Sequence, residues 1–214
     1  MTVKISPRLA SILNTASSPA EAQRLWLAAI AGNADAALAL VNLLSKRHRA
    51  RLVAELGHAK VPAAVLRPAL QAAWTSDHAQ LLAACPPGRL LPLFKRAAFD
   101  TSHLPDQITV YRGTRARVAE GARELAWSKS RERAAWMALW EGRIGGGRVL
   151  PPPRAGKPIV IRASVDRSRI LAAFSGGGDT EIVLTPPVPV ALETDDQVEL
   201  TKLARRAGLL ALRA

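Results

Sequence analysis

The first hundred residues show the spacing of apolar positions that is typical of amphipathic helices. Ser6-Pro7 and Ser18-Pro19 each place a capping residue before a proline, which favours the first turn of a helix, and Glu21 adds a capping-box spacing to the second. Between Gly32-Asn33 and Gly57, leucine and valine recur at helical spacing, which indicates one long helix that ends at Gly57.

Prolines divide the rest of this region. Pro62, Pro68 and Pro86-Pro87 are expected to interrupt helices, because proline lacks an N–H and clashes with the preceding turn. One more helix is predicted over Leu90–Ala98. Residues 1–100 are therefore expected to form an all-helical region of four to six helices.

The pattern changes after Asp100 to short β-branched runs separated by turns. Strands are predicted at Ile108–Tyr111, Glu124–Trp127, Ile159–Val165, Ile182–Thr185 and Val188–Leu192. Helices are predicted at Ser130–Glu141 and Asp195–Ala207, and the triple glycines 145–147 and 176–178 are expected to be loops. The chain is thus predicted to be an α+β protein, with a helical region over 1–100 and a second domain over 101–214.

Charge changes the picture of what the protein contacts. The 30 Lys and Arg and 17 Asp and Glu residues give a formal net charge of +13, with +7 in residues 1–100 and +6 in residues 101–214. Such a charge favours polyanions, most obviously nucleic acid, although solubility or a bound acidic partner would produce the same charge. The run "KRHRAR", Lys46 to Arg51, is expected late in the long helix. It is interpreted either as a solvated helix face or as a nucleic-acid contact.

Cysteine and histidine usage limits other chemistry. Cys85 is the single cysteine, so no internal disulfide forms, and we expect a reducing, cytoplasmic environment. The four histidines have no ligand spacing with carboxylates or with Cys85, so no metal is assigned. No run of about 18 apolar residues is present and the N-terminus is unlike a signal peptide, so no membrane association is expected.

Three features of the second half suggest a site for an anionic substrate. Arg112 ends a predicted strand and suits phosphate, because its planar guanidinium donates two parallel hydrogen bonds; the following Gly113 would let a ligand approach the backbone. Ser128 ends the next predicted strand. Glu181 begins another strand, directly after the glycine-rich "SGGGDT".

This order of residues resembles the arginine–serine–glutamate class of ADP-ribosyltransferases, which includes cholera-toxin-like and many phage or bacterial toxin domains. The motifs that carry the resemblance are "VYRGT", "LAWSKSRERAAWMA" and "DTEIVLTP", and they span roughly residues 105–190. The resemblance implies a split β-sheet core. It also implies that NAD is the substrate, with Arg112 on its diphosphate and ribose and Gly113, Trp127 and Ser128 around it.

The resemblance also implies roles for the remaining motif residues. Glu181 would stabilise the oxocarbenium-like ribose that forms as nicotinamide leaves, and Ser128 would orient that carboxylate. Asp179 stands where many members have Glu or Gln, a position that often decides the acceptor, and Gly177 lies in the loop that would recognise the acceptor. In "SKS", Ser130 is favoured as the cap of the following helix.

The sequence therefore predicts a mono-ADP-ribosyltransferase that modifies a nucleic acid or a protein, with NAD as substrate and no metal. Such an enzyme fits a toxin of a toxin–antitoxin, phage-defence or effector system, acting in its own or a target cell's cytoplasm and neutralised by an acidic antitoxin or immunity protein. The alternative is a non-catalytic, basic nucleic-acid-binding protein that retains the transferase fold.

Overall fold

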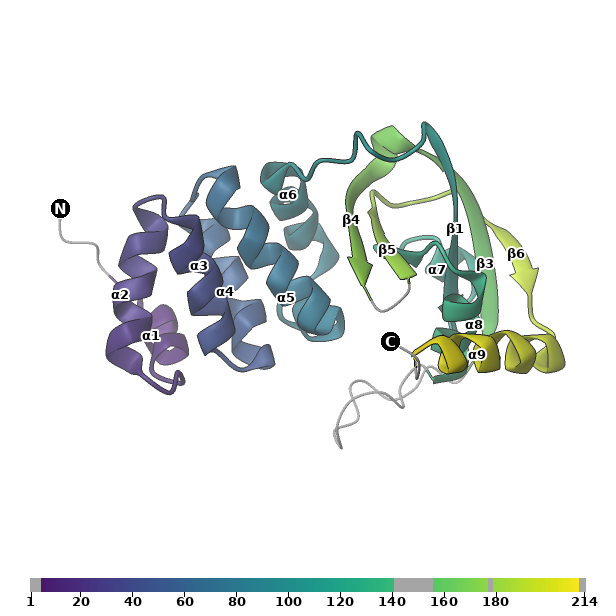
Figure 1. The fold of residues 1–214 in the computed structure, drawn as a ribbon, viewed down its shortest axis with the longest axis horizontal. Helices are drawn as coiled ribbons and strands as arrows, with labels where there is room; N and C mark the ends of the chain where they lie inside the picture. The colour runs from purple at the N-terminus through teal and green to yellow at the C-terminus, as the bar shows by residue number, and fades with distance from the viewer. Residues whose placement is uncertain (1–4, 141–155, 177–178, 212–214) are drawn as a thin grey trace. The chain divides into compact units, whose positions relative to one another are not determined.

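A computed structural model describes residues 5–140, 156–176 and 179–211 (Figure 1). The chain divides into two compact units, Met1–Phe99 and Asp100–Ala214. This boundary lies one residue from the one expected from the change of pattern at Asp100. No helix among the described residues is long and apolar enough to cross a membrane.

The first unit is helical throughout its described residues. Its helices are α1 (Pro7–Leu13), α2 (Pro19–Ile30), α3 (Ala34–Leu43), α4 (Lys46–His58), α5 (Ala63–Ala84) and α6 (Pro87–Ala97). Two of the expected starts are confirmed, because α1 and α2 begin at the prolines of the Ser-Pro pairs. The caps differ, however. The Ser6 hydroxyl accepts the Leu9 N–H at 3.1 Å, whereas Ser18 makes no such bond.

The long helix predicted up to Gly57 is wrong, because the chain forms two helices there. Leu44 and Ser45 adopt extended backbone angles between α3 and α4, and Asn33 caps α3 by accepting the Ala36 N–H at 2.9 Å. The "KRHRAR" run consequently opens α4 and does not lie late in a helix. Cations in a first turn oppose the helix dipole, so this run weakens the start of α4.

The predicted break at Pro68 is also wrong, because α5 continues through this residue. A proline inside a helix removes one backbone hydrogen bond and costs about 3 kcal/mol. Packing of α5 against α3, α4 and α6 outweighs that local cost. Pro86-Pro87 behaves as expected, since it separates α5 from α6.

Three arginines of the first unit satisfy carbonyls at the ends of neighbouring helices. Arg49 donates to the Leu44 carbonyl at 2.8 Å, beyond α3, and Arg67 donates to the Ala97 carbonyl at 2.9 Å, at the end of α6. Arg96 donates to the Gly57 carbonyl at 3.0 Å, at the end of α4. These cations lie at the negative ends of helix dipoles, so part of the basic charge of this unit is structural.

The second unit mixes strands and helices, which agrees with the expected α+β class. Its elements are β1 (Gln107–Thr114), α7 (Val118–Gly121), β2 (Ala126–Ser128), α8 (Arg131–Trp140), β3 (Ile159–Asp166), η1 (Arg167–Arg169), β4 (Ile170–Gly176), β5 (Asp179–Leu184), β6 (Ala191–Thr194) and α9 (Gln197–Ala211). Strand β4 and the short α7 were not predicted. The expected loop at 145–147 lies outside the described residues.

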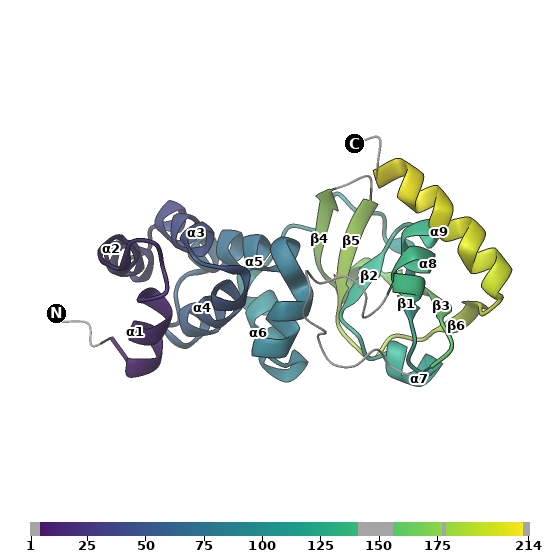
Figure 2. The same cartoon turned by 90° about the horizontal axis from the view of Figure 1, so that it is seen from below.

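The strands form one antiparallel sheet in the order β4-β5-β2-β1-β3-β6. β1 pairs with β3 over eight residue pairs, whereas β1 and β2 share the single register pair Tyr111–Ser128. The sheet therefore consists of two three-stranded halves, β4-β5-β2 and β1-β3-β6, which meet at one point. Figures 1 and 2 show β4 and β5 apart from the β1-β3-β6 half.

The inner face of this sheet closes on itself. One buried cluster contains Val110 and Ile161 from one half of the sheet and Trp127 and Ile182 from the other. The outer face is covered by helices, since a second cluster joins α8 and α9 to Val160 of β3. Figures 1 and 2 show α8 and α9 side by side against this face.

Candidate functional site

Ser128 and Glu181 lie opposite each other on neighbouring strands. They are register partners in the antiparallel β2–β5 pair, so both side chains point to the same face of the sheet. Cβ atoms of directly opposite residues lie about 4.5–5.5 Å apart, which brings the hydroxyl and the carboxylate within reach of each other. The structure thus brings together the two residues that the sequence predicts as a pair.

This pair lies on the outer face, next to the junction of the two half-sheets. Ser128 is also the register partner of Tyr111, whose ring packs against the cluster of α8 and α9. Tyr111, Ser128 and Glu181 therefore form a continuous row across three strands. Glu181 is half-buried at its place in this row.

The Ser128 hydroxyl holds the starts of two elements together. It donates a hydrogen bond to Asp179 Oδ2 at 2.6 Å and accepts the Ser130 N–H at 2.8 Å. The other oxygen of the same carboxylate, Asp179 Oδ1, accepts the Thr180 N–H at 2.7 Å. Both oxygens of Asp179 are thus engaged within the protein, and the start of β5 is fixed to the end of β2.

Ser130 caps α8, as its position predicts. Its hydroxyl accepts the Arg133 N–H at 3.0 Å and donates to Glu132 at 3.1 Å. The first residue of the helix, Arg131, lies 2.9 Å from Glu193 of β6 and 2.6 Å from Glu199 of α9. A hydrogen bond from Thr194 and the pairing with Arg131 hold the pKa of Glu199 below its ordinary value. The helix that follows Ser128 is therefore anchored at its N-terminus.

Arg112 is directed to the opposite, inner face, so the structure does not bring it together with Ser128 and Glu181 on one face, as the resemblance implies. Its register partner is Ile161, a member of the inner core. The guanidinium donates to the Ala126 carbonyl, and Nη2 lies 3.6 Å from Glu124 Oε2. Arg112 thus links β1 to Ala126 of β2 and to Glu124, which precedes β2. These contacts lie near the single register pair that the two strands share. Its side chain is 17% exposed, so a negatively charged group can still reach it.

Gly113 serves helix packing. A Cβ built at this position would lie 1.7 Å from the Ala134 carbonyl oxygen and 2.6 Å from the Ala138 nitrogen, both in the backbone of α8. The prediction that its missing side chain admits a cofactor is corrected here, because α8 occupies that space. The glycine lets a helix lie directly on β1.

Trp127 belongs to the inner core. Its side chain is 2% exposed, and its indole N–H donates to the Glu124 carbonyl at 3.0 Å. This burial gives the tryptophan a packing role and leaves it almost no surface for a ligand. The partner of Arg112, Glu124, was not predicted from the sequence. No periodicity or motif marks this residue, because its contact with Arg112 arises only when β1 packs next to it in the fold.

The last predicted residue, Gly177, lies outside the described residues. Gly176 and Asp179, which stand before and after residues 177–178, are register partners, so Gly176 belongs to β4 and not to the predicted loop. Among the described residues, no three His, Cys, Asp or Glu side chains gather in a group that could hold a metal ion.

The chain matches no protein-family model, no curated protein and no solved structure in the comparisons made with each of them.

Proposed function

We propose that the second unit is a mono-ADP-ribosyltransferase that transfers ADP-ribose from NAD to a macromolecule. The observation that supports this most is the cross-strand pair of Ser128 and Glu181. Ser128 also pairs with Tyr111 of β1, the strand that carries Arg112. A carboxylate fixed on a strand and flanked by a hydroxyl is suited to stabilise a positive charge that develops on a sugar ring.

The proposed reaction breaks the bond between C1′ of the nicotinamide ribose and the ring nitrogen. Nicotinamide leaves as a neutral molecule with the bonding electron pair, and the ribose gains oxocarbenium character. Glu181 accepts a hydrogen bond from the 2′-hydroxyl and stabilises this charge. A nucleophile of the acceptor then bonds to C1′ and gives up its proton. Ser128 keeps the strands in register and so positions Glu181.

In this proposal Arg112 binds the diphosphate of NAD. Its guanidinium already contacts Glu124 and the Ala126 carbonyl, which hold its side chain in one orientation. A guanidinium has five N–H donors, so these contacts leave donors for a diphosphate. Because Arg112 and Glu181 point to opposite faces, NAD binds in this proposal at the junction of the two half-sheets, where the diphosphate on Arg112 positions the reactive carbon near Glu181.

A toxin role accounts for the charge. An active enzyme of this kind would harm the cell that makes it, and the net charge of +13 suits neutralisation by an acidic protein. Action in the cytoplasm of the same or of a target cell belongs to the same proposal. The charge also favours nucleic acid as the acceptor, since a basic enzyme associates with nucleic acid more readily than a neutral one does.

The test uses NAD labelled in its adenylate phosphate. The purified protein is incubated with this NAD and a cell lysate, and label in macromolecules and free nicotinamide are both measured. We expect labelled macromolecules that disappear on treatment with nuclease. Label that resists nuclease but disappears with protease would instead identify a protein acceptor. Absence of both label transfer and nicotinamide release would refute the proposed transferase activity.

Replacement of Arg112 by lysine is expected to weaken NAD binding by roughly 10-fold to 100-fold. Lysine keeps the charge but cannot donate two parallel hydrogen bonds, and hydrogen bonds to charged groups are worth about 1.5–3 kcal/mol. Calorimetric titration with NAD measures the change. Arg162→Lys is the matched control, because Arg162 lies on β3, is 54% exposed and points to the outer face. Equal affinities of the two variants would contradict the role of Arg112.

Replacement of Asp179 by asparagine distinguishes two roles of this residue. Asparagine keeps one oxygen that can accept the Ser128 hydroxyl, but it loses the charge and the acceptor of the Thr180 N–H. If Asp179 positions Ser128, both nicotinamide release and transfer should stay within about threefold of the wild type. If Asp179 activates the acceptor as a base, transfer alone should fall by about 10²–10⁴-fold. We expect the first result, because both carboxylate oxygens are engaged.

The rival function, a non-catalytic nucleic-acid-binding protein, has one observation in its favour. Arg112 makes internal contacts that would hold the two half-sheets together without any NAD. Such a protein would bind nucleic acid with strong salt dependence, release no nicotinamide and be insensitive to Glu181→Ala.

A further inference from the structure

The basic run at the start of α4 contains cations of two kinds. Arg49 is structural, because its guanidinium donates to the Leu44 carbonyl and to the Ser76 hydroxyl, each at 2.8 Å. Three other side chains of the run make no hydrogen bond or ion pair with any residue that the structure describes. Two of them are exposed and the third is half-buried; they are Lys46, Arg47 and Arg51, and together they are called the α4 patch.

The α4 patch opposes the helix that carries it. Lys46 and Arg47 lie in the first turn, where the positive end of the helix dipole repels cations. Arg47 and Arg51 are four residues apart, so two like charges are neighbours on one face. Ser45, at the N-cap, makes no capping bond, and its hydroxyl contacts His48 Nδ1 at 2.9 Å. A run that weakens its own helix is expected where it serves contact with another molecule.

The carboxylate at the usual spacing for an ion pair does not neutralise the α4 patch. Glu55 stands four residues after Arg51 on the same helix, but it pairs with Arg8 of α1 at 3.2 Å. Burial, together with the positive charges of Arg51 and Arg47, also lowers the pKa of His48 below its ordinary value. The start of α4 is therefore positive, and an anion is suited to it.

The α4 patch lacks the apolar anchor that a protein interface has at its centre. Such interfaces bury aromatic or other large side chains, whose loss costs most of the affinity. In the described part of the first unit, the large hydrophobic side chain that is exposed is Leu27, and it lies on α2. An acidic protein would meet only solvated charges here. The phosphates of nucleic acid, in contrast, are bound by such charges alone.

The surroundings favour a DNA duplex over other nucleic acids. Single strands are held by stacking of bases on aromatic side chains. The described aromatic side chains of the first unit are buried or packed on one another: Trp26, Trp74, Phe94 and Phe99. Duplex RNA is recognised in part through its 2′-hydroxyl groups. The hydroxyl nearest to the patch in sequence, that of Ser45, already contacts His48.

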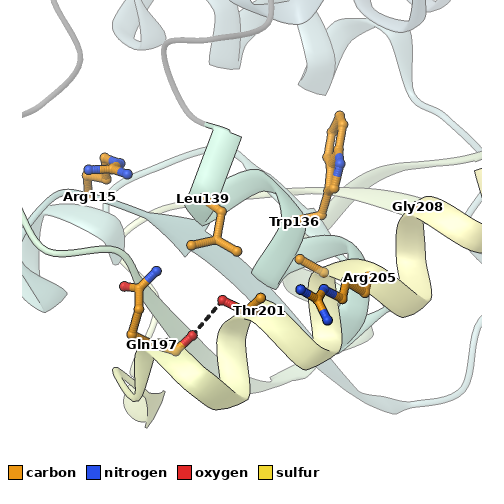
Figure 3. A pocket seen from close by; sticks show the side chains of 8 residues that line it. Arg115, Trp136, Leu139, Gln197, Thr201, Arg205 and Gly208 are labelled. Carbon is orange, nitrogen blue, oxygen red and sulfur yellow. Dashed lines mark hydrogen bonds between the residues drawn. The ribbon is translucent and has the colours of Figure 1, made fainter.

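The groove between α8 and α9 of the second unit is less suited to phosphates (Figure 3). Its volume is about 450 Å³, and Arg115 and Arg205 are among its lining residues. The exposed lining is almost wholly apolar, however, and the Trp136 ring is directed away from α9. The α4 patch therefore presents its cations to a polyanion more openly than this groove does.

We propose that the α4 patch binds the phosphate backbone of double-stranded DNA. Arg47 and Arg51 are about one turn apart, roughly 6 Å along the helix axis, so both can contact phosphates of one strand. Lys46 adds a third cation in the first turn. Contacts to phosphates alone make the binding independent of base sequence. This inference goes beyond the proposed function and does not depend on it, because the patch lies in the first unit.

The test measures binding of the full chain to labelled DNA duplexes of about 16 base pairs by fluorescence anisotropy, without NAD and at several salt concentrations. The double variant Arg47→Gln, Arg51→Gln should weaken binding by about 10-fold to 100-fold at about 0.1 M salt. It should also lower the slope of log affinity against log salt by about two, one for each lost phosphate contact. Two duplexes of unrelated sequence should bind alike.

The matched control removes the same charge elsewhere in the first unit. Arg89 and Lys95 are exposed cations of α6, and the double variant Arg89→Gln, Lys95→Gln should leave both the affinity and the salt slope nearly unchanged. Equal losses in the two double variants would overturn the inference, because net charge alone would then attract the DNA. Unchanged binding of the Arg47→Gln, Arg51→Gln protein would overturn it as well.

Amide hydrogen exchange gives a second readout, which a structural role of these arginines would move in the opposite direction. Replacement of Arg47 and Arg51 by glutamine removes two unfavourable charges, so exchange over residues 46–52 should become slower while DNA binding becomes weaker. Faster exchange there would show that the arginines stabilise α4 and would overturn the inference. The Arg89→Gln, Lys95→Gln protein should exchange like the wild type over the same residues.

Other ligands test the choice of duplex DNA. Tighter binding of single-stranded DNA or of duplex RNA would overturn the assignment to a DNA duplex. Tighter binding of polyglutamate, with the same dependence on Arg47 and Arg51, would identify an acidic protein as the occupant and overturn it too. DNA binding without NAD cleavage would refute only the proposed function, and NAD cleavage without DNA binding would refute only this inference.

Discussion

Glu181→Gln should lower the rate of nicotinamide release from NAD by about 10²–10³-fold, the usual effect of removing one group that stabilises transition-state charge. Glutamine has nearly the same shape as glutamate, so the β2–β5 pairing should persist. What is lost is the negative charge next to the developing oxocarbenium ion. Because the carboxylate acts only as charge develops, we expect kcat to fall while the affinity for NAD changes little.

Two comparisons make this result specific to the site. Glu120→Gln removes the same charge from an exposed position on α7 and should leave nicotinamide release unchanged. Ser128→Ala should lower the rate less than Glu181→Gln does, because Ser128 acts by orienting its neighbours. A Glu181→Gln protein that is folded, binds NAD and keeps wild-type activity would refute the transferase proposal.

Gly113→Ala should destabilise the second unit by about 3 kcal/mol, at the upper end of the range for overpacked cores. The added methyl group would stand 1.7 Å from a backbone oxygen of α8, and backbone cannot move aside as a flexible side chain can. α8 would have to move away from β1, which would also disturb the buried cluster that it shares with α9. Urea denaturation followed by tryptophan fluorescence measures the loss.

Gly208→Ala is the opposite case on another helix. Its new methyl group would meet nothing within 4 Å, and alanine favours the helix by about 1 kcal/mol over glycine. The same substitution should therefore stabilise the unit at Gly208 and destabilise it at Gly113. A Gly113→Ala protein within about 0.5 kcal/mol of the wild type would contradict the close contact between β1 and α8.

Local signals in the sequence predict the elements better than their limits. Most strands of the second unit follow from β-branched residues, but β4 was missed because "ILAAFSG" is rich in alanine and ends in glycine. Its burial alternates along the strand, and that pattern arises from pairing with β5. In the first unit, local rules placed a break at Pro68 that contacts with three other helices override.

The candidate site was predictable in its residue types and not in its geometry. The pairing of Ser128 with Glu181 depends on a strand register between distant segments, which local propensity does not determine. For the same reason, the sequence could not assign the two carboxylate oxygens of Asp179 to Ser128 and Thr180. Gly113 was misread because a missing side chain has the same appearance in sequence whether a ligand or a helix fills the space.

The order of the strands also determines when the candidate site is assembled during synthesis. The helices of the first unit form from local contacts, so we expect this unit to fold soon after it leaves the ribosome. β2, in contrast, pairs with β1 at one residue pair and otherwise depends on β5, which is made much later. Until β5 emerges, Ser128 has no Glu181 beside it. Under the proposed function, a nascent chain would therefore release no nicotinamide before β5 has been made.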